Sequence, residues 1–474
     1  SILPATDTSQ LLALIVAKRV LEDATQRQFT KLDRERVSVI LGTTSAQELV
    51  SHMSARLQRP VWVKALREHG LPEDEVQSIC DRIAGHYVPW QESTFPGLLG
   101  NVIAGRIANR MDLGGINCVT DAACASSLAA LQMAASELWH GDSELVITGG
   151  VETLNDIFMY ACFSKTPALS PTEDCRPFSE DADGTMLGEG LGMLALRRLA
   201  DAEKDGDRIY AVIRGIGGSS DGRAKSIYAP VPAGQARALR RAYAAAGYGP
   251  ETVELVEAHG TGTRAGDAAE YEGLKAVFEA SGRKERQWCA LGSIKSQLGH
   301  TKAAAGVAGL MKAVLALHHK VLPPTIKVSR PNPTLHLEQG PFHLNTEARP
   351  WIRGSEHPRR ASVSSFGFGG SNFHVALEEY AGPAQPARRM RALPSELLLL
   401  AAPDTGALAQ RCHELAREAA APGDLARLAW RSLGEFAAND SVRLAVVAAD
   451  EADLAAKLER AAAAVLHNPE TAFD

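Results

Sequence analysis

Residues 116–140, INCVTDAACASSLAALQMAASELWH, show the pattern that decides the fold of this chain. Residues 116–120 are mostly apolar and predict a buried strand, whereas residues 126–140 are rich in alanine and leucine and predict a helix. The turn between them, DAACASS, consists of small residues around Cys124. A strand, a small-residue turn and an Ala-rich helix in this order are typical of one unit of an α/β fold.

The same order occurs twice more along the chain. Residues 253–257 lead through AHGTGT to a helix over about 268–279, and residues 290–293 lead through KSQLGHTKAAAG to a helix over 303–317. This alternation indicates sheets buried between helices. Further strands are predicted at residues 37–41, 145–148, 193–197 and 211–213, and further helices from a cap at Asp7 or Thr8 to Glu22 and over 96–111. Residues 46–93 are less regular and are interpreted as an excursion from the core.

Composition excludes several classes of protein. The 474 residues carry 50 Lys+Arg against 56 Asp+Glu, a net charge of −6, which does not favour nucleic acid as a partner. The longest strongly apolar stretch, residues 303–311, is far too short to span a membrane. The seven cysteines are scattered without a CxxC pair, which fits neither a disulfide framework nor a zinc site. We therefore expect a cytoplasmic protein without a structural metal.

The composition changes near residue 380. The segment GPAQPARRMRALPSE at 382–396 combines proline, glycine and arginine without periodicity, as a linker does. Beyond it, strands at 397–402 and 441–448 and helices at about 405–420, 424–433 and 451–466 predict a small α/β unit without a recognisable catalytic group. We predict two domains, residues 1–383 and 384–474.

Cys124 follows a predicted strand and precedes a helix that Ser126 or Ser127 can cap. A thiol at a helix N-terminus meets the positive end of the helix dipole and unpaired N–H groups, which predicts a lowered pKa. The neighbouring alanines leave room for a ligand to reach the sulfur. Taken alone, the residue fits a reactive nucleophile and a small buried core cysteine equally well.

Two histidines favour the reactive interpretation. His259 in EAHGTGT and His300 in KSQLGHTKAAAG each follow a predicted strand, and strand ends can converge on one pocket. Lys295 precedes His300 in the same motif, and Asp267 and Glu270 follow the His259 turn. These carboxylates can pair with Lys295 and fix the site, or form an ordinary surface ion pair.

Residues 365–374, SFGFGGSNFH, contain a glycine-rich turn. Such a turn can present backbone N–H groups to an oxyanion or can serve only to reverse the chain. The glycines of GEGLG at 188–192 precede a strand rather than a helix, so they are not a dinucleotide-binding fingerprint.

These motifs together resemble those of the β-ketoacyl synthases. DAACASS is similar to the family's nucleophile motif, EAHGTGT to its first histidine motif, KSQLGHTKAAAG to its motif with a lysine and a second histidine, and FGFGGSN to its closing glycine-rich loop. The similarity covers roughly residues 1–380. It implies a thiolase-like α/β fold, in which two similar halves form an αβαβα five-layer sandwich, and a homodimer.

Finer features point to a subgroup. FMYACFSKTPALSP, GDRIYAVIRGIG and HHKVLPPT look most like ketosynthases of polyunsaturated fatty acid synthases and related iterative polyketide synthases, and residues 384–474 resemble the linker between ketosynthase and acyltransferase. In one respect the chain departs from the family. Family members usually open with a glycine-ended strand of the IAIVGM type, so Ser1 corresponds to a point inside the domain and we expect that an N-terminal stretch is missing from this sequence.

The resemblance also implies a reaction and the residues that perform it. In a decarboxylative Claisen condensation, the thiolate of Cys124 accepts an acyl chain, which then joins malonyl-acyl carrier protein. His259 and His300 would stabilise the malonyl-derived enolate. Lys295, with Glu270, would hold the polar network and His300 in place.

Other residues acquire roles by the same resemblance. The main-chain N–H groups of Cys124 and Phe368 would form the oxyanion hole, and Phe368 would also gate the acyl pocket. Thr261 and Thr263 match positions that touch the pantetheine arm. Candidate residues lining the acyl pocket are Phe158, Met159 and Met186. No metal and no bound organic cofactor are implied, because phosphopantetheine arrives on the acyl carrier protein.

The implied partners are an acyl carrier protein, the adjacent acyltransferase domain, and malonyl and acyl thioesters. Two alternatives stay open. A non-decarboxylating thiolase would use a second cysteine where this chain has histidine. A non-catalytic dimer partner, similar to a chain-length factor, would not need Cys124, His259 and His300 intact.

Overall fold

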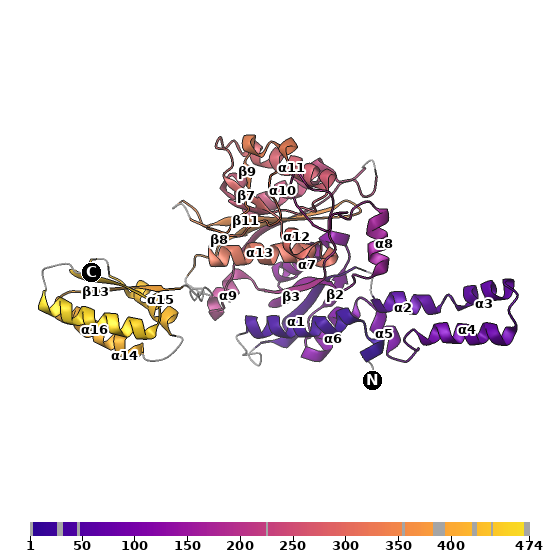
Figure 1. Ribbon diagram of the computed structural model, residues 1–474, viewed down its shortest axis with the longest axis horizontal. Coiled ribbons are helices and arrows are strands. Elements are labelled where there is room, and N and C mark those ends of the chain that lie inside the picture. The colour runs from indigo at the N-terminus through magenta and orange to yellow at the C-terminus, as the bar shows by residue number, and fades with distance from the viewer. Residues whose placement is uncertain are drawn as a thin grey trace. The chain divides into compact units, whose positions relative to one another are not determined.

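The computed structural model describes residues 3–25, 32–44, 48–223, 226–352, 356–382, 394–419, 424–437 and 439–468. The chain divides into two compact units, Ser1–Pro386 and Ala387–Asp474 (Figure 1). The predicted boundary between residues 383 and 384, and most of the predicted linker, lie outside the described residues.

The first sheet of the larger unit contains the strand that precedes Cys124. Its order is β2-β1-β3-β4, with bounds β1 (Val37–Gly42), β2 (Asn117–Thr120), β3 (Leu145–Glu152) and β4 (Gly190–Leu196). β1 runs parallel to both β2 and β3, and β4 is antiparallel to β3. All residues of β1 and β3 are buried, which explains why both are continuously apolar or small rather than alternating.

The second sheet repeats this arrangement. Its order is β5-β12-β11-β6-β7-β9, with bounds β5 (Val212–Ser220), β6 (Leu255–Glu257), β7 (Cys289–Gly292), β9 (Phe342–Leu344), β11 (Arg360–Gly367) and β12 (Ser371–Glu378). β6 is parallel to β7 and β11, and β12 is antiparallel to β11, so β7, β6, β11 and β12 correspond to β2, β1, β3 and β4. The expectation of two similar halves is confirmed. A separate two-stranded ribbon pairs β8 (Val321–Leu322) with β10 (Arg349–Pro350).

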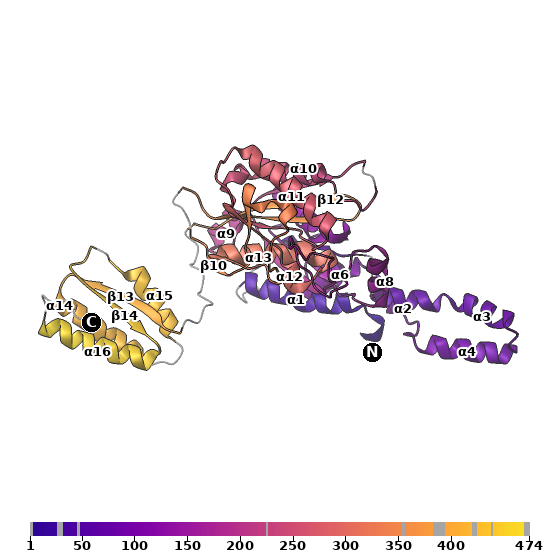
Figure 2. The ribbon, with the colours of Figure 1, turned by 45° about the horizontal axis from the view of Figure 1, so that its top comes forward.

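Helices complete a five-layer sandwich. α1 and α6 cover the outer face of the first sheet, α7 and α13 lie between the sheets, and α10 and α11 cover the second sheet (Figures 1 and 2). The helix bounds are α1 (Thr8–Ala24), α5 (Thr94–Leu98), α6 (Val102–Met111), α7 (Ser126–His140), α8 (Ile157–Lys165), α9 (Leu199–Asp205), α10 (Pro232–Ala246), α11 (Arg264–Phe278), α12 (Lys295–Leu298) and α13 (Ala305–His319). The thiolase-like fold class is thereby confirmed.

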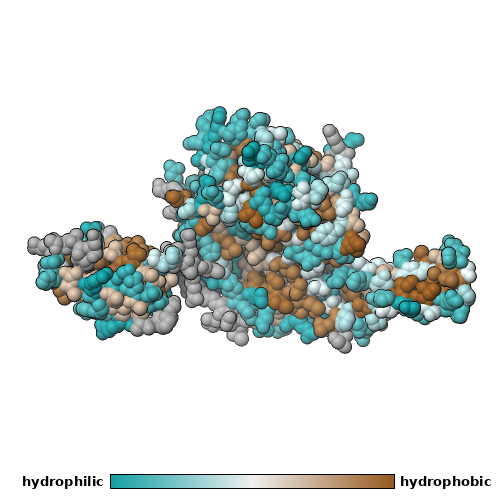
Figure 3. Space-filling model, in the orientation of Figure 1, coloured by the Kyte–Doolittle hydropathy of each residue, from teal (hydrophilic) through white to brown (hydrophobic). Residues whose placement is uncertain are grey.

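Two predicted segments differ in detail. The single helix predicted over 96–111 is broken into α5 and α6, because the side-chain amide of Gln10 binds the carbonyls of Pro96, Gly97 and Leu99 where the helix is interrupted. The excursion 46–93 is more regular than predicted, with helices α2 (Glu48–Arg56), α3 (Arg59–Glu68) and α4 (Glu73–Gly85). α3 and α4 extend away from the sheets, and apolar side chains gather on their surface (Figures 1 and 3).

The smaller unit contains the predicted strands and helices. β13 (Glu396–Ala402) pairs antiparallel with β14 (Val442–Ala448), and α14 (Thr405–Glu418), α15 (Leu425–Glu435) and α16 (Glu451–His467) pack around the pair. Leu398, Leu428 and Leu458 belong to a buried core formed within this unit. Among the described residues of the whole chain, no helix is long and apolar enough to cross a membrane.

Candidate active site

Cys124 lies in a short 3₁₀ turn, Ala123–Ala125, between β2 and α7. Ala123 adopts a left-handed φ of 50°, and its N–H donates to the carboxylate of Asp121 at 2.9 Å. This turn places the cysteine at the start of α7, as predicted. The predicted capping is wrong: Ser126 Oγ binds within the turn, to Ala122 N and Ala123 O, while Ser127 Oγ accepts the N–H of Val307 in α13 at 2.9 Å. The start of α7, directly after Cys124, is therefore held by the opposite half.

The glycine-rich turn between β11 and β12 packs directly against the cysteine. Ser365 Oγ donates to the carbonyl of Cys124 at 2.7 Å. A Cβ on Gly367 would lie 2.1 Å from the carbonyl oxygen of Ala122, so only glycine permits this approach. The N–H of Phe368 and the N–H of Cys124 itself both act on the thiol and lower its pKa. The side chain of Phe368 is 47% exposed and contacts the ring of Phe163, with centroids 6.5 Å apart.

The thiol of Cys124 is less acidic than the sequence predicts. The residue is only 7% exposed, and burial raises its pKa to about 11. The positive charge of Lys295 and the two N–H groups lower the pKa but do not offset the loss of solvation, and the carboxylate of Glu152 raises it further. The prediction of a lowered pKa is therefore wrong for the unliganded site, because the helix start lies in the interior between the two sheets.

The structure brings His259 and His300 together. Their ring centroids are 5.5 Å apart with the rings edge to face. Burial lowers the pKa of each imidazole well below its ordinary value, and the nearby ammonium of Lys295 lowers both further, so both rings are neutral. The N–H of Lys302 donates to His300 Nδ1 at 3.0 Å, which leaves the ring proton on Nε2. Nδ1 of His259 is buried without a hydrogen-bond partner within the described part of the chain.

Lys295 is the cation common to these groups. It is 3% exposed, and its ammonium donates to the main-chain carbonyl of His259. Its charge acts on Cys124, His259 and His300. Burial lowers the pKa of Lys295, against the opposing effect of the carboxylate of Glu270.

The predicted pairing of the two carboxylates with Lys295 is not found as a direct contact. Glu270 accepts the N–H groups of His259 and Gly260 at 2.8 and 2.7 Å, and Asp267 accepts those of Phe178 and Gly262 at 2.7 and 3.1 Å. Burial raises the pKa of each carboxyl to about 7. Both side chains therefore shape the main chain of the histidine loop.

Thr261 and Thr263 lie on the same loop after β6. Their hydroxyls are 2.9 Å apart, and Thr263 is partly exposed, as is Thr261. Thr263 also caps α11 through Gly266 N. Of the predicted pocket residues, Phe158 is 54% exposed on α8, and the carbonyl of Met186 accepts the N–H of His300 at 2.6 Å.

The sequence interpretation missed three polar residues beside the site. Glu152 ends β3, Asn155 follows it, and Lys302 lies two residues beyond His300. The ammonium of Lys302 is 3.6 Å from Glu152 Oε1 and 2.5 Å from Asn155 Oδ1. The available signal was a lysine within the motif KSQLGHTKAAAG and a glutamate at the end of a fully buried strand.

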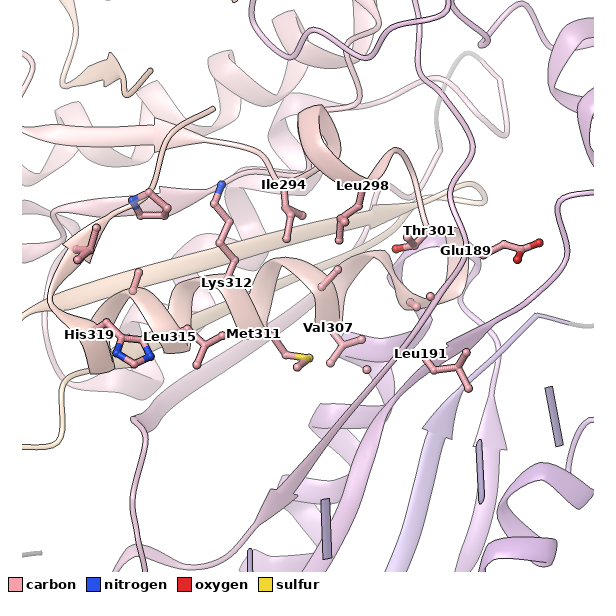
Figure 4. A pocket seen from close by; sticks show the side chains of 17 residues that line it. Glu189, Leu191, Ile294, Leu298, Thr301, Val307, Met311, Lys312, Leu315 and His319 are labelled. Atoms are coloured by element: carbon pink, nitrogen blue, oxygen red, sulfur yellow. The ribbon is translucent and has the colours of Figure 1, made fainter. Parts of the chain in front are cut away.

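A cavity of about 530 Å³ lies elsewhere, between the start of β4 and α13 (Figure 4). Its walls are mainly apolar, with Leu191 on one side and Val307, Met311 and Leu315 on the other. Cys124, His259 and His300 do not line it, so this apolar hollow is separate from the reactive groups. Within the described ranges, no three His, Cys, Asp or Glu side chains are grouped to hold a metal ion.

Comparisons with known proteins agree with this geometry. Residues 2–202 match the family "Beta-ketoacyl synthase, N-terminal domain", residues 210–329 match "Beta-ketoacyl synthase, C-terminal domain", and residues 331–431 match "Ketoacyl-synthetase C-terminal extension". The chain is 44% identical over 401 residues to a polyunsaturated fatty acid synthase protein of Thraustochytrium sp., covering 84% of this chain and 14% of that protein. It is 43% identical over 376 residues to the spectinabilin polyketide synthase system protein NorA' of Streptomyces orinoci, covering 78% and 10%.

Solved structures show the same similarity. The ketosynthase from module 6 of the bacillaene synthase from Bacillus subtilis 168 superimposes with a TM-score of 0.68 at 30% identity, covering 98% of this chain and 73% of that chain. An oxazolomycin ketosynthase domain of Streptomyces albus JA3453 gives a TM-score of 0.67 at 30% identity, covering 97% and 74%. The chain thus spans most of these ketosynthase structures but a small part of the curated synthases.

Proposed function

Because the chain belongs to the β-ketoacyl synthase family, whose members are acyltransferases that form C–C bonds, we propose that it catalyses a decarboxylative Claisen condensation within a polyunsaturated fatty acid or polyketide synthase. Cys124 holds the growing acyl chain, and malonyl-acyl carrier protein supplies the two-carbon extender. The observation that carries this proposal is that one buried cation, Lys295, acts on the Cys124 thiol and on two adjacent neutral imidazoles, while two main-chain N–H groups act on the same thiol.

In the first step, the sulfur of Cys124 attacks the carbonyl carbon of an acyl thioester. A new S–C bond forms, the C–S bond to the carrier breaks, and the proton of Cys124 goes to the departing thiolate. Negative charge develops on the carbonyl oxygen beside the N–H groups of Cys124 and Phe368, which already converge on the sulfur. These donors are fixed in advance, because Gly367 and Ser365 lock the glycine-rich turn onto the cysteine turn.

In the second step, malonyl thioester loses CO₂. The electron pair of the broken C–C bond forms an enolate. The enolate oxygen needs a neutral hydrogen-bond donor whose proton stays on one known nitrogen. His300 meets this need, because its Nδ1 accepts a main-chain N–H and its proton therefore resides on Nε2. His259 provides a second imidazole beside it. The enolate carbon then attacks the acyl carbon on Cys124, the C–S bond breaks, and the departing thiolate of Cys124 takes a proton from water to become the thiol again.

The carrier protein and its prosthetic arm enter as substrate. Thr261 and Thr263 present hydroxyls on the loop that bears His259, and such groups can bind the amides of a pantetheine arm. The chemistry needs no metal and no resident organic cofactor. Residues 384–474 would connect this domain to an acyltransferase, and the cytoplasm is the compartment in which the substrates would meet it.

A second copy of the chain is the proposed structural partner. α3 contains no buried residue, although Val61 on it is apolar and 59% exposed. Ile157 on α8 is 86% exposed and Trp139 on α7 is 87% exposed, and β2 lies at the edge of its sheet. A second copy that covered these side chains would remove them from water. Sedimentation velocity should show a dimer at micromolar concentration, and a monomer at all concentrations would contradict it.

The experiment that tests the function is intact-protein mass spectrometry after incubation with acyl thioesters. The wild-type chain should gain one acyl group that maps to Cys124, and then release a 3-ketoacyl product on addition of malonyl-acyl carrier protein. Cys124→Ala should abolish both. His300→Ala should spare self-acylation more than malonyl decarboxylation, and equal loss of both would contradict the division of labour.

The two alternatives make different predictions in the same assay. A thiolase would accept acetyl in place of malonyl donors, whereas the proposed enzyme would not. A non-catalytic dimer partner would leave Cys124 unlabelled by acyl thioester and by iodoacetamide. The match to ketosynthases along both halves of the larger unit favours neither alternative.

A further inference from the structure

A buried ion pair adjoins the histidines but has no role in the reaction described above. Lys302 and Glu152 have side chains that are 4% and 2% exposed, with Nζ and Oε1 3.6 Å apart. The ammonium also donates to Asn155 Oδ1 at 2.5 Å and to the carbonyl of Gly188 at 3.0 Å. Three anchors thus hold one cation within a few residues of His300.

The turn that carries Lys302 does not itself need an ammonium. Lys302 has a left-handed φ of 45° and opens the 3₁₀ turn Lys302–Ala304 before α13. In the other half, Ala123 has φ 50° and opens the equivalent turn before α7. Each residue donates its N–H to the side chain two positions earlier, Ala123 to Asp121 and Lys302 to His300. Since alanine adopts this conformation, the lysine side chain has another task.

That task is visible in the contacts of the main chain of His300. Its N–H donates to the carbonyl of Met186 at 2.6 Å, and its carbonyl accepts the N–H of Gly188 at 3.0 Å. Lys302 binds the carbonyl of the same Gly188. The ammonium therefore braces the segment 186–188, which holds His300, against the end of β3 in the nucleophile's half.

Burying two charges costs solvation free energy, which their attraction and hydrogen bonds offset only when the geometry is favourable. An isolated pair in the interior contributes little net stability, and removal of one partner leaves an uncompensated charge. A left-handed lysine adds local strain, which persists where the surrounding structure imposes it. This pair lies between the half that carries Cys124 and the second histidine, His300. A function in the active site would explain why its unfavourable burial is retained.

We propose that Lys302, anchored by Glu152 and Asn155, is a positioning residue that fixes the imidazole of His300 with its Nε2–H directed at the developing enolate. Lys302 makes two contacts that fix His300. Its main-chain N–H donates to Nδ1 of His300, and its ammonium donates to the carbonyl of Gly188, whose own N–H binds the carbonyl of His300. This inference rests on the proposed function, because the enolate is formed only if malonyl is decarboxylated.

The test compares Lys302→Met with the wild-type chain. Decarboxylation of malonyl-acyl carrier protein should fall about 10- to 100-fold in kcat with little change in KM, because small displacements of a catalytic group cost this much. Self-acylation of Cys124, which does not use His300, should stay within about 3-fold. In ¹⁵N-histidine-labelled protein, the signal assigned by comparison with His300→Ala should change from one Nε2–H tautomer to a mixture.

Two further variants separate positioning from stability. Lys302→Met with Glu152→Gln removes both charges, so it should fold even if Lys302→Met does not, and should still show the loss in kcat and the mixed tautomer. Lys312→Met removes another buried pair on α13, in which Nζ lies 2.8 Å from Glu257 Oε2 and the side chains are 8% and 1% exposed. It should lower the melting temperature but leave the tautomer of His300 unchanged.

The outcomes decide between the two proposals. A single Nε2–H tautomer and wild-type kcat in the double variant would overturn the role of Lys302. An equal loss of kcat for malonyl decarboxylation in Lys302→Met and Lys312→Met would also overturn it, because the loss would then follow from removing any buried ion pair. A wild-type chain that does not decarboxylate malonyl, with the tautomer change still present, would refute the proposed function and leave the positioning role standing.

Discussion

Gly367→Ala should disable the oxyanion donors while leaving every catalytic side chain in place. Gly367 lies at the end of β11, where an added Cβ would meet the carbonyl oxygen of Ala122 at 2.1 Å and its carbonyl carbon at 3.2 Å. Both atoms are main chain and belong to the turn that carries Cys124. An ordinary contact begins near 3.4 Å, so the two turns must separate by about 1.3 Å.

The size of the rate loss depends on which hydrogen bond this separation breaks. Phe368 is the next residue after Gly367, and its N–H is one of the two main-chain donors that lower the pKa of the Cys124 thiol. A hydrogen bond whose donor–acceptor distance grows by more than about 1 Å is lost. Removing one preorganised oxyanion donor costs about 2.7–4 kcal/mol, or about 100- to 1,000-fold in rate. Overpacking should also destabilise the fold by about 1–3 kcal/mol.

The assay is the rate at which acyl thioester adds mass to Cys124, measured beside thermal unfolding. Gly85→Ala is the control, because Gly85 has no atom within 4 Å of an added Cβ and lies at the end of α4, away from the cysteine turn. Gly367→Ala should acylate at least about 100-fold more slowly than this control. A rate within about 3-fold, with an unchanged melting temperature, would show that the close approach does not position the donors.

Three other predictions follow from the same structure. Alkylation of Cys124 by iodoacetamide should accelerate about 10-fold per pH unit from about pH 7 to pH 9, because a pKa near 11 keeps the thiolate a minor species; a plateau below about pH 8 would contradict this. Lys295→Met should slow the alkylation at any one pH, since loss of the positive charge raises the pKa of the thiol further, and an unchanged rate would show that the charge does not reach the sulfur. Leu428→Ala should destabilise the smaller unit by about 2–5 kcal/mol by creating a cavity in its own core, with labelling of Cys124 as the check that the larger unit is unaffected.

Local sequence was sufficient for the elements around the site. The helix predicted from Ala-rich composition begins at Ser126 and ends at His140, as in the structure, because the small-residue turn before it and Gly141 after it mark both ends. The strand predicted at 37–41 is found with one residue added. Motifs with a reactive residue in a turn also placed Cys124 before a helix and His259 after a strand, whereas the short helix α12 separates His300 from β7. His259 and His300 nevertheless lie side by side.

Contacts between distant segments were not predictable in this way. The sequence predicts a cap at Ser126 or Ser127, but the hydroxyl of Ser127 binds Val307, 180 residues away, and the hydroxyl of Ser365 reaches Cys124 over 241 residues. Charge alone allows Asp267 and Glu270 either to pair with Lys295 or to form surface ion pairs. They instead bind main-chain N–H groups, which leave no signal in the sequence.

The sequence by itself determined which side chains are candidates for the chemistry and most of the strands and helices that present them, because periodicity and small-residue turns act over a few residues. Only the tertiary structure decided their protonation. The thiol of Cys124 has a raised pKa and both histidines are neutral, because the five layers exclude water from the place where the two halves meet. The solvation of a charge depends on everything packed around it, and many of those neighbours come from the opposite half of the chain.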